Sequence, residues 1–380
     1  MADDTRLRRT YRYRIYPTVR LRLALEAQLG FACQLYNAAL EERRYAWRGR
    51  RRSVTLYEQF RELTAVRAAK MGPPNMSCSA MRDPLRRLDW AFAAYFRRVK
   101  EGVTPGYPRF RSVRRYDSLT WNSGWGVRDG RLALPGIGQI KVKWHRALPA
   151  SAVVRTVTVR RVAERWYASF SLRVCGSRQG LATQLPAVGL DLGIHHFATL
   201  STGEQIPGPR AYIAAMRRLR IAQRRLCRRE KASHRRQKAR LLLARHHERV
   251  RNHRHDHAHK LTRRMVCDFG LIVVEDLNVG GLARGRLAKH VTDQGWATFL
   301  RMLEYKAAEA GARVIRVPPG GTSQACSGCG AFVPKLLSER IHRCPQCGLI
   351  IDRDMNAARN ILRLGLSRQA STWPTGACVA

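Results

Sequence analysis

Three short segments, far apart in the chain, carry carboxylates in positions that suit a metal site. Asp191 lies in VGLDLGI, residues 188–194, where apolar residues alternate with Gly189, Asp191 and Gly193 as they do along a β-strand. The polar face would then hold a single carboxylate between two glycines. We expect these glycines to let a metal ion and a nucleic-acid backbone come close. A hydrogen-bonded polar residue within a sheet is the alternative role for Asp191.

Glu275 and Asp354 are the second and third candidates. Glu275 follows the apolar run at 271–274, and the carboxyl end of a strand is where ligands bind in open α/β sheets. Asp354 lies in DRDMNAARNI, whose apolar residues recur as on one face of a helix, and it would stand at or near the helix start. A helix N-cap is the ordinary role for such an aspartate, and Asp352 is the alternative carboxylate.

The set Asp191, Glu275 and Asp354 offers the oxygen ligands that Mg²⁺ or Mn²⁺ prefers. Two such ions about 4 Å apart activate a water molecule and stabilise the leaving oxygen when a phosphodiester is hydrolysed. We therefore predict that these three carboxylates are both the ligands of two divalent ions and the catalytic residues of a phosphodiester-hydrolysing site.

A second metal site is predicted by two Cys-x-x-Cys pairs, CSGCG at 326–330 and CPQCG at 344–348. Four thiolates at this spacing are typical of a zinc ribbon, in which one Zn²⁺ is enclosed and has a structural role. The pairs fall between Glu275 and Asp354, so the ribbon is inserted into the fold that carries the carboxylates. The predicted zinc ligands are Cys326, Cys329, Cys344 and Cys347.

The charge of the chain predicts a polyanionic partner. The 380 residues include 71 Lys and Arg against 27 Asp and Glu, which gives a formal net charge of +44. Neutralising phosphates releases condensed counterions, and this drives binding to nucleic acid. We find neither an apolar run of about 20 residues nor the apolar core of a signal peptide. We therefore expect a cytoplasmic, nucleoid-associated prokaryotic protein with no membrane partner.

The elements around these sites follow from hydrophobic periodicity. Residues 9–17 alternate as in a strand, residues 21–98 repeat apolar positions at helical spacing, and residues 102–174 return to short strands that include TPGYPRF at 104–110. Strands on both sides of a helical block predict one β-barrel with a helical insertion. Residues 176–187 are interpreted as a linker.

Residues 211–269 contain no glycine and no proline, and lysine and arginine crowd them. We predict two long helices with a break near Ser233. A run of charge is usually a solvated face, but its length and single sign favour a surface that follows a nucleic-acid backbone. The candidate backbone contacts are Arg217, Arg218, Arg224, Arg225, Arg228 and Arg229.

The order of these motifs resembles the TnpB family, the OrfB-type proteins of insertion sequences. The successive segments GLDLGI, IVVEDLN, TSQACSGCG with HRCPQCG, and DRDMNAARNIL look like the C-terminal signatures of that family. RYRIYPT, LYNAALEERR, LRRLDWAFAAYFRRVK, GYPRFRS and RYDSLTW look like its N-terminal segments. The resemblance therefore covers nearly the whole chain.

The resemblance implies an α+β multidomain protein. A wedge-type β-barrel, split by a helical-bundle insert, would precede a RuvC-like nuclease of the RNase H fold that carries the zinc ribbon. The implied boundaries are 1–20 and 101–178 for the barrel, 21–100 for the helical recognition insert, 185–320 and 351–366 for the nuclease, 321–350 for the ribbon, and 367–380 for a C-terminal tail.

The resemblance also implies an activity and partners. The chain would be an RNA-guided endonuclease of double-stranded DNA, a monomer bound to a guide RNA transcribed from the end of its own transposable element. The family's catalytic acids match Asp191, Glu275 and Asp354, and Arg340 matches a basic position that would help at the scissile phosphate. Recognition of a short motif beside the target is assigned to polar residues after Pro73-Pro74. These candidates are Asn75, Ser77, Ser79 and Arg82.

Three alternatives share parts of this pattern. A three-acid DNA transposase has a similar core but normally carries a separate DNA-binding module such as a helix-turn-helix, and no convincing one is visible in the sequence. A compact type V CRISPR effector has almost the same motifs. A nuclease-inactive, RNA-guided DNA-binding repressor is disfavoured because all three carboxylates are present.

Overall fold

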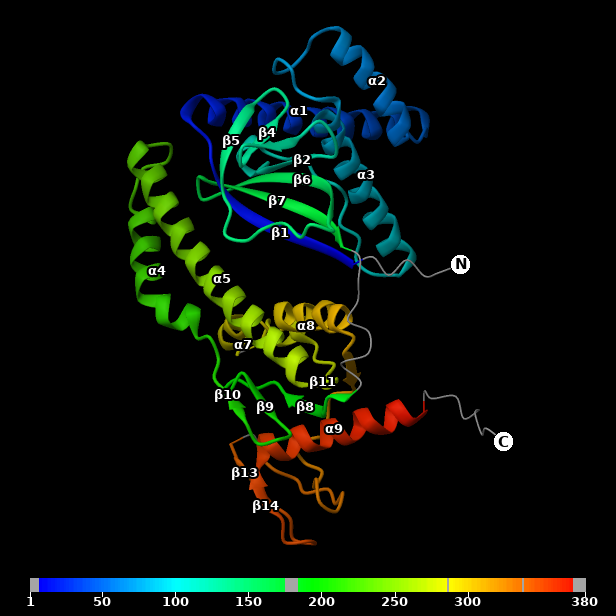
Figure 1. Cartoon of the computed structure of the whole chain (residues 1–380), viewed down its shortest axis with the longest axis vertical. Helices are drawn as coiled ribbons and strands as arrows, with labels where there is room; N and C mark the ends of the chain where they lie inside the picture. Colours follow the sequence, from blue (N-terminus) through cyan, green and yellow to red (C-terminus); the bar gives the residue numbers. More distant parts are fainter. Residues whose placement is uncertain (1–6, 175–183, 286, 337, 372–380) are drawn as a thin grey trace, which may run out of the picture. The chain divides into compact units, whose positions relative to one another are not determined.

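The computed structural model describes residues 7–174, 184–285, 287–336 and 338–371. The chain divides into two compact units, Met1–Gly176 and Ser177–Ala380 (Figure 1). Both units combine helices with a β-sheet, so the protein is of the α+β class. None of the helices in these described stretches is long and apolar enough to cross a membrane.

The first unit is built on a seven-stranded antiparallel sheet with the order β2-β6-β7-β1-β5-β4-β3. The sheet is curled (Figure 1), and β2 and β3 are its edges, so the described strands do not close into a ring by pairing. Buried side chains alternate with partly buried ones along β7 and β2, which places Phe170 and Trp121 in the core, and Tyr13 of β1 is fully buried with them. The strands are β1 Leu7–Tyr16, β2 Ser118–Trp121, β3 Gly126–Arg128, β4 Arg131–Leu134, β5 Gly138–Lys143, β6 Val153–Val162 and β7 Arg165–Val174.

Three α-helices and a short 3-10 helix at Val113–Arg115 lie between β1 and β2 in the chain. The α-helices are α1 Val19–Arg50, α2 Leu56–Ala68 and α3 Cys78–Lys100. Each begins at a serine or threonine cap, and Thr55 forms a capping box with Glu58 at the start of α2. These helices share one apolar core with the sheet. The expected strand at 104–110 is wrong, because no strand forms there. Its two prolines cannot donate backbone hydrogen bonds to a sheet.

The second unit contains a five-stranded sheet with the order β10-β9-β8-β11-β12. The central strands β8 Ala187–Asp191, β11 Leu271–Glu275 and β12 Arg313–Val317 are parallel, whereas β9 Ala198–Leu200 and β10 Gln205–Ile206 are antiparallel. Ile272 and Val274 share one apolar core with helices α5 His234–Asp268 and α8 Trp296–Ala310. Val273 faces the opposite way, toward α9 Arg353–Ser371.

Two helices, α4 Ala211–Cys227 and α5, form a long hairpin in this unit (Figure 1). Ser233 caps α5 by accepting a hydrogen bond from the backbone NH of Arg236, so the predicted break is at the predicted residue. The start of α4 is fixed by Asp293, which accepts hydrogen bonds from the NH groups of Tyr212 and Ile213 at 2.7 and 3.0 Å. Asp293 belongs to α7 Ala288–Gln294, which follows the short helix α6 Val279–Leu282.

The cysteine-containing segment lies between β12 and α9. Its described residues include the antiparallel pair β13 Ile341–Arg343 and β14 Ile350–Asp352. β14 leads directly into α9, so the cysteine segment is joined to the start of that helix without an intervening loop.

Candidate metal sites and nucleic-acid surface

The sheet of the second unit brings Asp191 and Glu275 to one edge. β8 and β11 run parallel in a register that pairs Leu190 with Val274, so the next residues of the two strands are Asp191 and Glu275. Asp354 lies in the first turn of α9, which packs against the same two strands. The structure therefore brings the three predicted carboxylates together from two strands and one helix.

Gly189 has a different role from the one expected. A Cβ atom at this position would lie 2.1 Å from the carbonyl oxygen of Ala358 and 2.7 Å from the backbone nitrogen of Leu362, both in α9. The glycine is needed because the helix backbone packs directly on the strand, so the space beside it is filled by protein. The expected approach of a metal ion or nucleic acid at Gly189 is therefore wrong, and β8 ends at Asp191, before Gly193.

The carboxylates perturb one another electrostatically. Burial, followed by the negative charges of Glu275 and Asp354, raises the pKa of Asp191 from 3.8 to about 8. Burial also raises the pKa of Glu275, and the hydroxyl of Thr322 opposes this by donating a hydrogen bond to the carboxylate. Unlike the cysteine sulfurs described below, the oxygens of these three acids do not all lie within 4.8 Å of one another. Carboxylate oxygens are nevertheless the ligands that a divalent cation prefers, and its charge would favour their ionised forms.

The two aspartates at the start of α9 have separate roles. Asp352 Oδ1 accepts hydrogen bonds from the NH groups of Asp354 and Met355, at 2.9 and 3.0 Å, and so caps the helix. Asp354 is thereby left to face the other acids and two arginines. Its Oδ1 is 3.3 Å from Arg353 Nη2, and its Oδ2 is 3.7 Å from Arg340 Nη1.

The four predicted cysteines come together at the other site. Their sulfur atoms lie within 4.8 Å of one another, with 3.6 Å between Cys326 and Cys347 and 3.5 Å between Cys329 and Cys344. Four thiolates make a complete tetrahedral ligand set, so the cluster fits one Zn²⁺. Behind Cys326 lies His342, which is fully buried and contacts Lys335.

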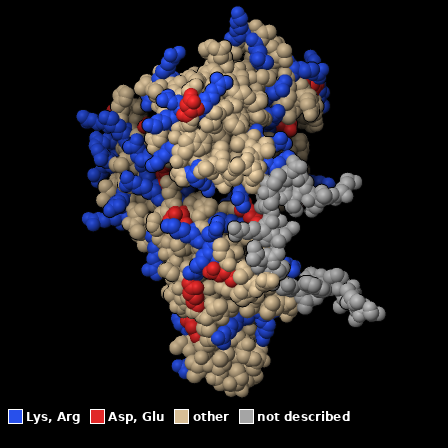
Figure 2. Space-filling model, viewed as in Figure 1, with Lys and Arg blue, Asp and Glu red and all other residues tan. Residues whose placement is uncertain are grey.

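The α4–α5 hairpin forms a basic surface. Figure 2 shows lysine and arginine side chains concentrated along this hairpin, with few acidic groups between them. Leu219 and Ala222 face inward on α4, whereas the predicted backbone-contact arginines are exposed, except that Arg229 is half-buried. Single-sign charge over two long helices suits a phosphate backbone.

Comparisons with known proteins place these features in one family. A family model described as a probable transposase, OrfB_IS605, matches residues 172–286. A protein of Streptomyces pristinaespiralis with the name "Putative RNA-guided DNA endonuclease" is 36% identical over 377 residues, which covers 96% of this chain and 91% of the relative. The chain belongs to the TnpB family. A second member, from Escherichia coli K12 and of the same named activity, is 30% identical over 75% of this chain and 74% of its own length.

Two further comparisons concern the fold of this TnpB-family chain. A Cas12f1 chain, solved in complex with single guide RNA and target DNA, superposes with a TM-score of 0.61 at 13% identity, covering 94% of this chain and 98% of that one. A model described as a Cas12f1-like TNB domain matches residues 296–361, which include the four cysteines. The overall fold is therefore shared with Cas12f1.

The family model that matches the N-terminal segment is named for a motif that differs from the secondary structure of this segment. A model described as a helix-turn-helix domain matches residues 5–52. In this TnpB-family chain that segment contains β1 and the single 32-residue helix α1, and no second helix packs across a turn within it. The expectation that no helix-turn-helix is visible in the sequence is therefore corrected, because a family model of that description matches residues 5–52. The described residues of the segment form one strand and one helix.

The candidate target-motif residues are only partly available. Ser77 caps α3 through a hydrogen bond from the NH of Ala80, and Ser79 accepts one from the NH of Asn122 at 2.7 Å. Arg82 stacks on the ring of Phe60, at 5.0 Å from its centroid. Asn75 is exposed, with a positive φ of 56° that asparagine tolerates. Of the four, Asn75 is the one whose side chain is free of such local contacts in the described structure.

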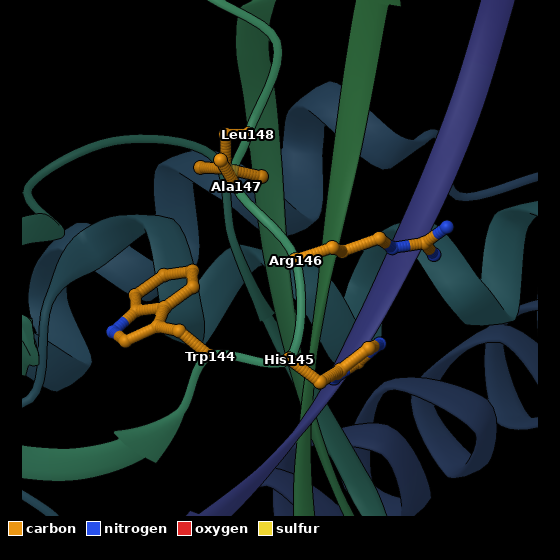
Figure 3. A pocket seen from close by; sticks show the side chains of 5 residues that line it. All are labelled: Trp144, His145, Arg146, Ala147 and Leu148. Atoms are coloured by element: carbon orange, nitrogen blue, oxygen red, sulfur yellow. The ribbon is translucent and has the colours of Figure 1, made fainter.

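A hollow of about 490 Å³ in the first unit is separate from these sites. It is lined by residues 144–148, and none of the predicted site residues is among them. Figure 3 shows Arg146 extending toward β1, where its guanidinium lies 3.5 Å from the centre of the Tyr11 ring. The hydroxyl of Tyr13 donates to the carbonyl of Arg146 at 3.3 Å, so this arginine joins the loop to the sheet.

Sequence reasoning missed the residues that surround the carboxylates and cysteines. Thr322, Asn356 and Asn360 are buried and connect the carboxylates to the cysteine segment through hydrogen bonds. A spacing of four residues between two asparagines on one helix was the available signal, since such residues share a face. Buried asparagines need partners, which the apolar periodicity of that helix does not reveal.

Proposed function

We propose that this chain is an RNA-guided endonuclease of double-stranded DNA, associated with a transposable element. The observation that carries the proposal is the gathering of Asp191, Glu275 and Asp354 at one edge of the second sheet. The TnpB-family relatives named as RNA-guided DNA endonucleases support the same activity. The β8–β11–β12 sheet with α9 on one face is proposed to be a RuvC-like nuclease of the RNase H type.

The three acids are proposed to hold two Mg²⁺ or Mn²⁺ ions. When bound, two such ions polarise an attacking water and neutralise the charge that develops on the leaving oxygen. The role of the chain is to hold the carboxylates at the strand ends, half-buried and close enough to repel one another when no cation is present. Arg340 lies beside Asp354, and we assign to it a contact with the scissile phosphate.

The cysteine cluster is proposed to be a zinc ribbon with a structural role. A closed set of four sulfur ligands leaves no open position for a substrate. Its place between β12 and α9 means that zinc would fix the segment that leads into Asp354. The ribbon would thus serve the nuclease site by holding its last carboxylate in place.

The RNA partner follows from the charge and from how that charge is arranged. The net charge of +44 exceeds what a short DNA site needs, and the exposed arginines of the α4–α5 hairpin match a phosphate backbone. A run of like charges cannot read base edges, whereas pairing between a guide and its target can. We propose that the chain binds a guide RNA permanently and that this RNA selects the DNA target.

The test is to purify the protein with its RNA and to sequence that RNA. We expect one defined species whose 3′ portion dictates the cleaved DNA, so that changing this portion redirects cleavage. The control is the same protein after RNase treatment, which should no longer cut. If RNA-free protein cut or joined one defined DNA sequence as well as before, the guided mechanism would be wrong and the three-acid transposase would be favoured.

A compact CRISPR effector is the second candidate, and the Cas12f1-like fold favours it. The copurified RNA separates the two. A guide copied from the end of the chain's own transposable element supports the transposon-encoded function, whereas an RNA that carries CRISPR repeats supports the effector. A repressor without nuclease activity would bind target DNA with the same RNA and leave it uncut.

A further inference from the structure

The segment between β12 and the cysteine cluster makes direct contact with the carboxylate site. Thr322 is buried within this segment, and its hydroxyl donates a hydrogen bond of 2.5 Å to Oε1 of Glu275. Glu275 ends β11 and is itself buried. A short hydrogen bond to a carboxylate in a buried place fixes the orientation of that carboxylate.

Thr322 is held in turn by α9. Asn360 Nδ2 donates to the carbonyl oxygens of Thr322 and Ala325, at 2.8 and 2.7 Å. Asn356, one turn earlier on the same face, donates to Ala325 at 2.7 Å and accepts from the NH of Ser327 at 2.8 Å. Four hydrogen bonds, three donated and one accepted by the two buried asparagines, therefore hold residues 322–327 against the helix that carries Asp354.

The same segment ends in the cysteine cluster. Cys326 is the residue before Ser327, and its NH donates to the carbonyl of Ala331, just after the first Cys-x-x-Cys turn. A closed cluster would fix Cys326, and the asparagines fix the residues on either side of it. The chain thus forms a continuous connection from the cysteines, through Thr322, to Glu275.

We propose that Thr322 is a positioning residue for the divalent-metal site, and that Asn356, Asn360 and the cysteine cluster hold it in place. This rests on the proposed function, because Glu275 is taken to be a ligand of the ions. Groups that hold metal ligands in orientation typically contribute about 10–100-fold in metal affinity. Thr322 touches neither substrate nor the reacting atoms in this arrangement and acts through Glu275.

The test compares three variants of the full chain with its copurified RNA. Thr322→Val keeps the shape of the side chain and removes the hydroxyl, Thr322→Ala removes it with less bulk, and Thr322→Ser retains it. Mn²⁺ binding is followed by electron paramagnetic resonance, which detects free Mn²⁺. RNA also binds Mn²⁺, so the protein-bound fraction has to be identified. The component of bound Mn²⁺ that disappears in the Asp191→Ala variant is taken as the ion at the carboxylates.

We expect Thr322→Val and Thr322→Ala to weaken that component by about 10–100-fold, and Thr322→Ser to stay within about threefold of the wild type. The Mg²⁺ concentration for half-maximal cleavage should rise by the same factor, while the rate at saturating Mg²⁺ changes much less. Melting temperatures show whether a variant is folded, and one folded variant without the hydroxyl is sufficient.

The outcomes separate two failures. If Asp191→Ala removes no bound Mn²⁺, the metal site itself is misassigned, and the proposed function fails with it. If Asp191→Ala removes the ion but both hydroxyl-free variants bind it as the wild type does, the positioning role is wrong and the metal site stands. Equal weakening in Thr322→Ser would likewise overturn the role of the hydroxyl.

Discussion

The two candidate metal sites of the second unit are assembled in opposite ways. The cysteines come from two short turns, each closed by its own backbone hydrogen bonds, such as Gly330 NH to Cys326 at 2.9 Å and Gly348 NH to Cys344 at 3.0 Å. The carboxylates come from β8, β11 and α9, and they meet only when the sheet and helix have packed. A site made by local turns depends on a few residues, whereas a site made by tertiary packing depends on the whole unit.

The sharpest way to test this contrast is to remove a carboxylate. Asp191→Ala should lower the cleavage rate by about a thousandfold or more, because a ligand of the proposed two-metal site contributes several kcal/mol to transition-state stabilisation. Guide RNA should still bind, since Asp191 is not on the basic hairpin. Cleavage of a matched target, together with the amount of copurified RNA, measures both.

Asp276→Ala is the matched control for this variant. Asp276 follows Glu275 directly but is exposed and pairs with Arg316 at 2.8 Å. We expect this variant to cut within a few-fold of the wild-type rate. Near wild-type cleavage by Asp191→Ala would show that the carboxylate site is misassigned.

Removing a cysteine should damage the local site first. Cys344→Ser should lower the zinc content from one per chain toward zero, because apparent zinc-site free energies of about 10–16 kcal/mol in small peptides rest on a complete ligand set. Elemental analysis measures this, with Cys267→Ser, at an exposed cysteine of α5, as the control. Wild-type protein without zinc would contradict the ribbon.

The same variant also tests how far the two sites are separate. If residues 322–327 connect them, zinc loss in Cys344→Ser should weaken the divalent ion at the carboxylates in the way Thr322→Val does. Intact Mn²⁺ binding in zinc-free protein would show that the asparagines of α9 alone hold Thr322 in place.

A smaller effect is expected from Gly189→Ala, which disturbs the packing on which the carboxylate site depends. The added methyl group would lie against the backbone of α9, and overpacking of this kind costs about 1–3 kcal/mol. The melting temperature should fall, while zinc content is retained. Gly280→Ala, where the nearest atom would be 3.7 Å away, is the control and should melt as the wild type does. Equal melting of both variants would contradict the close packing of α9 on β8.

The mildest change concerns the basic hairpin. Replacing Arg224 and Arg225 with glutamine should reduce the salt dependence of RNA binding by about one per lost phosphate contact, for any RNA sequence. Arg264→Gln on α5 is the control, because Arg264 already pairs with Glu204 at 2.9 Å. The measurement is the dissociation constant for RNA over a series of salt concentrations, which gives the slope for each variant. An unchanged slope in the double variant would place the RNA elsewhere on the chain.

The sequence predicted the parts of this molecule that have local causes. The Cys-x-x-Cys turns, the strand that ends at Glu275 and the helix break at Ser233 are each set by neighbouring residues. The need for a glycine at position 189 comes instead from the close approach of the Ala358 backbone in α9. The hydroxyl of Ser79 already accepts a hydrogen bond from the NH of Asn122, which is distant in the chain. Such contacts form only in the folded structure, so no local sequence pattern predicts them.

The same distinction explains why the sequence left the choice between Asp352 and Asp354 open. Both are acidic residues at a helix start, and the pattern leaves either one as the cap. Only the backbone path from β14 into α9 shows that Asp352 receives the two NH groups and that Asp354 faces the other acids. The contact between Thr322 and Glu275 could not be predicted for a related reason, because a single threonine in a loop belongs to no periodic pattern.

The α4–α5 hairpin has a consequence for the lifetime of the protein. Its two helices meet along a narrow seam that includes Leu219, Val250 and Leu243, while like charges repel one another along its length. A polyanion bound there would stabilise the closed hairpin by mass action, whereas the unbound hairpin would open more readily. Opening would unfold the backbone around its many lysines and arginines, which is the form that trypsin-like proteases cut. Turnover of the chain would then follow the supply of its RNA, so that protein made without a guide is the first to be degraded.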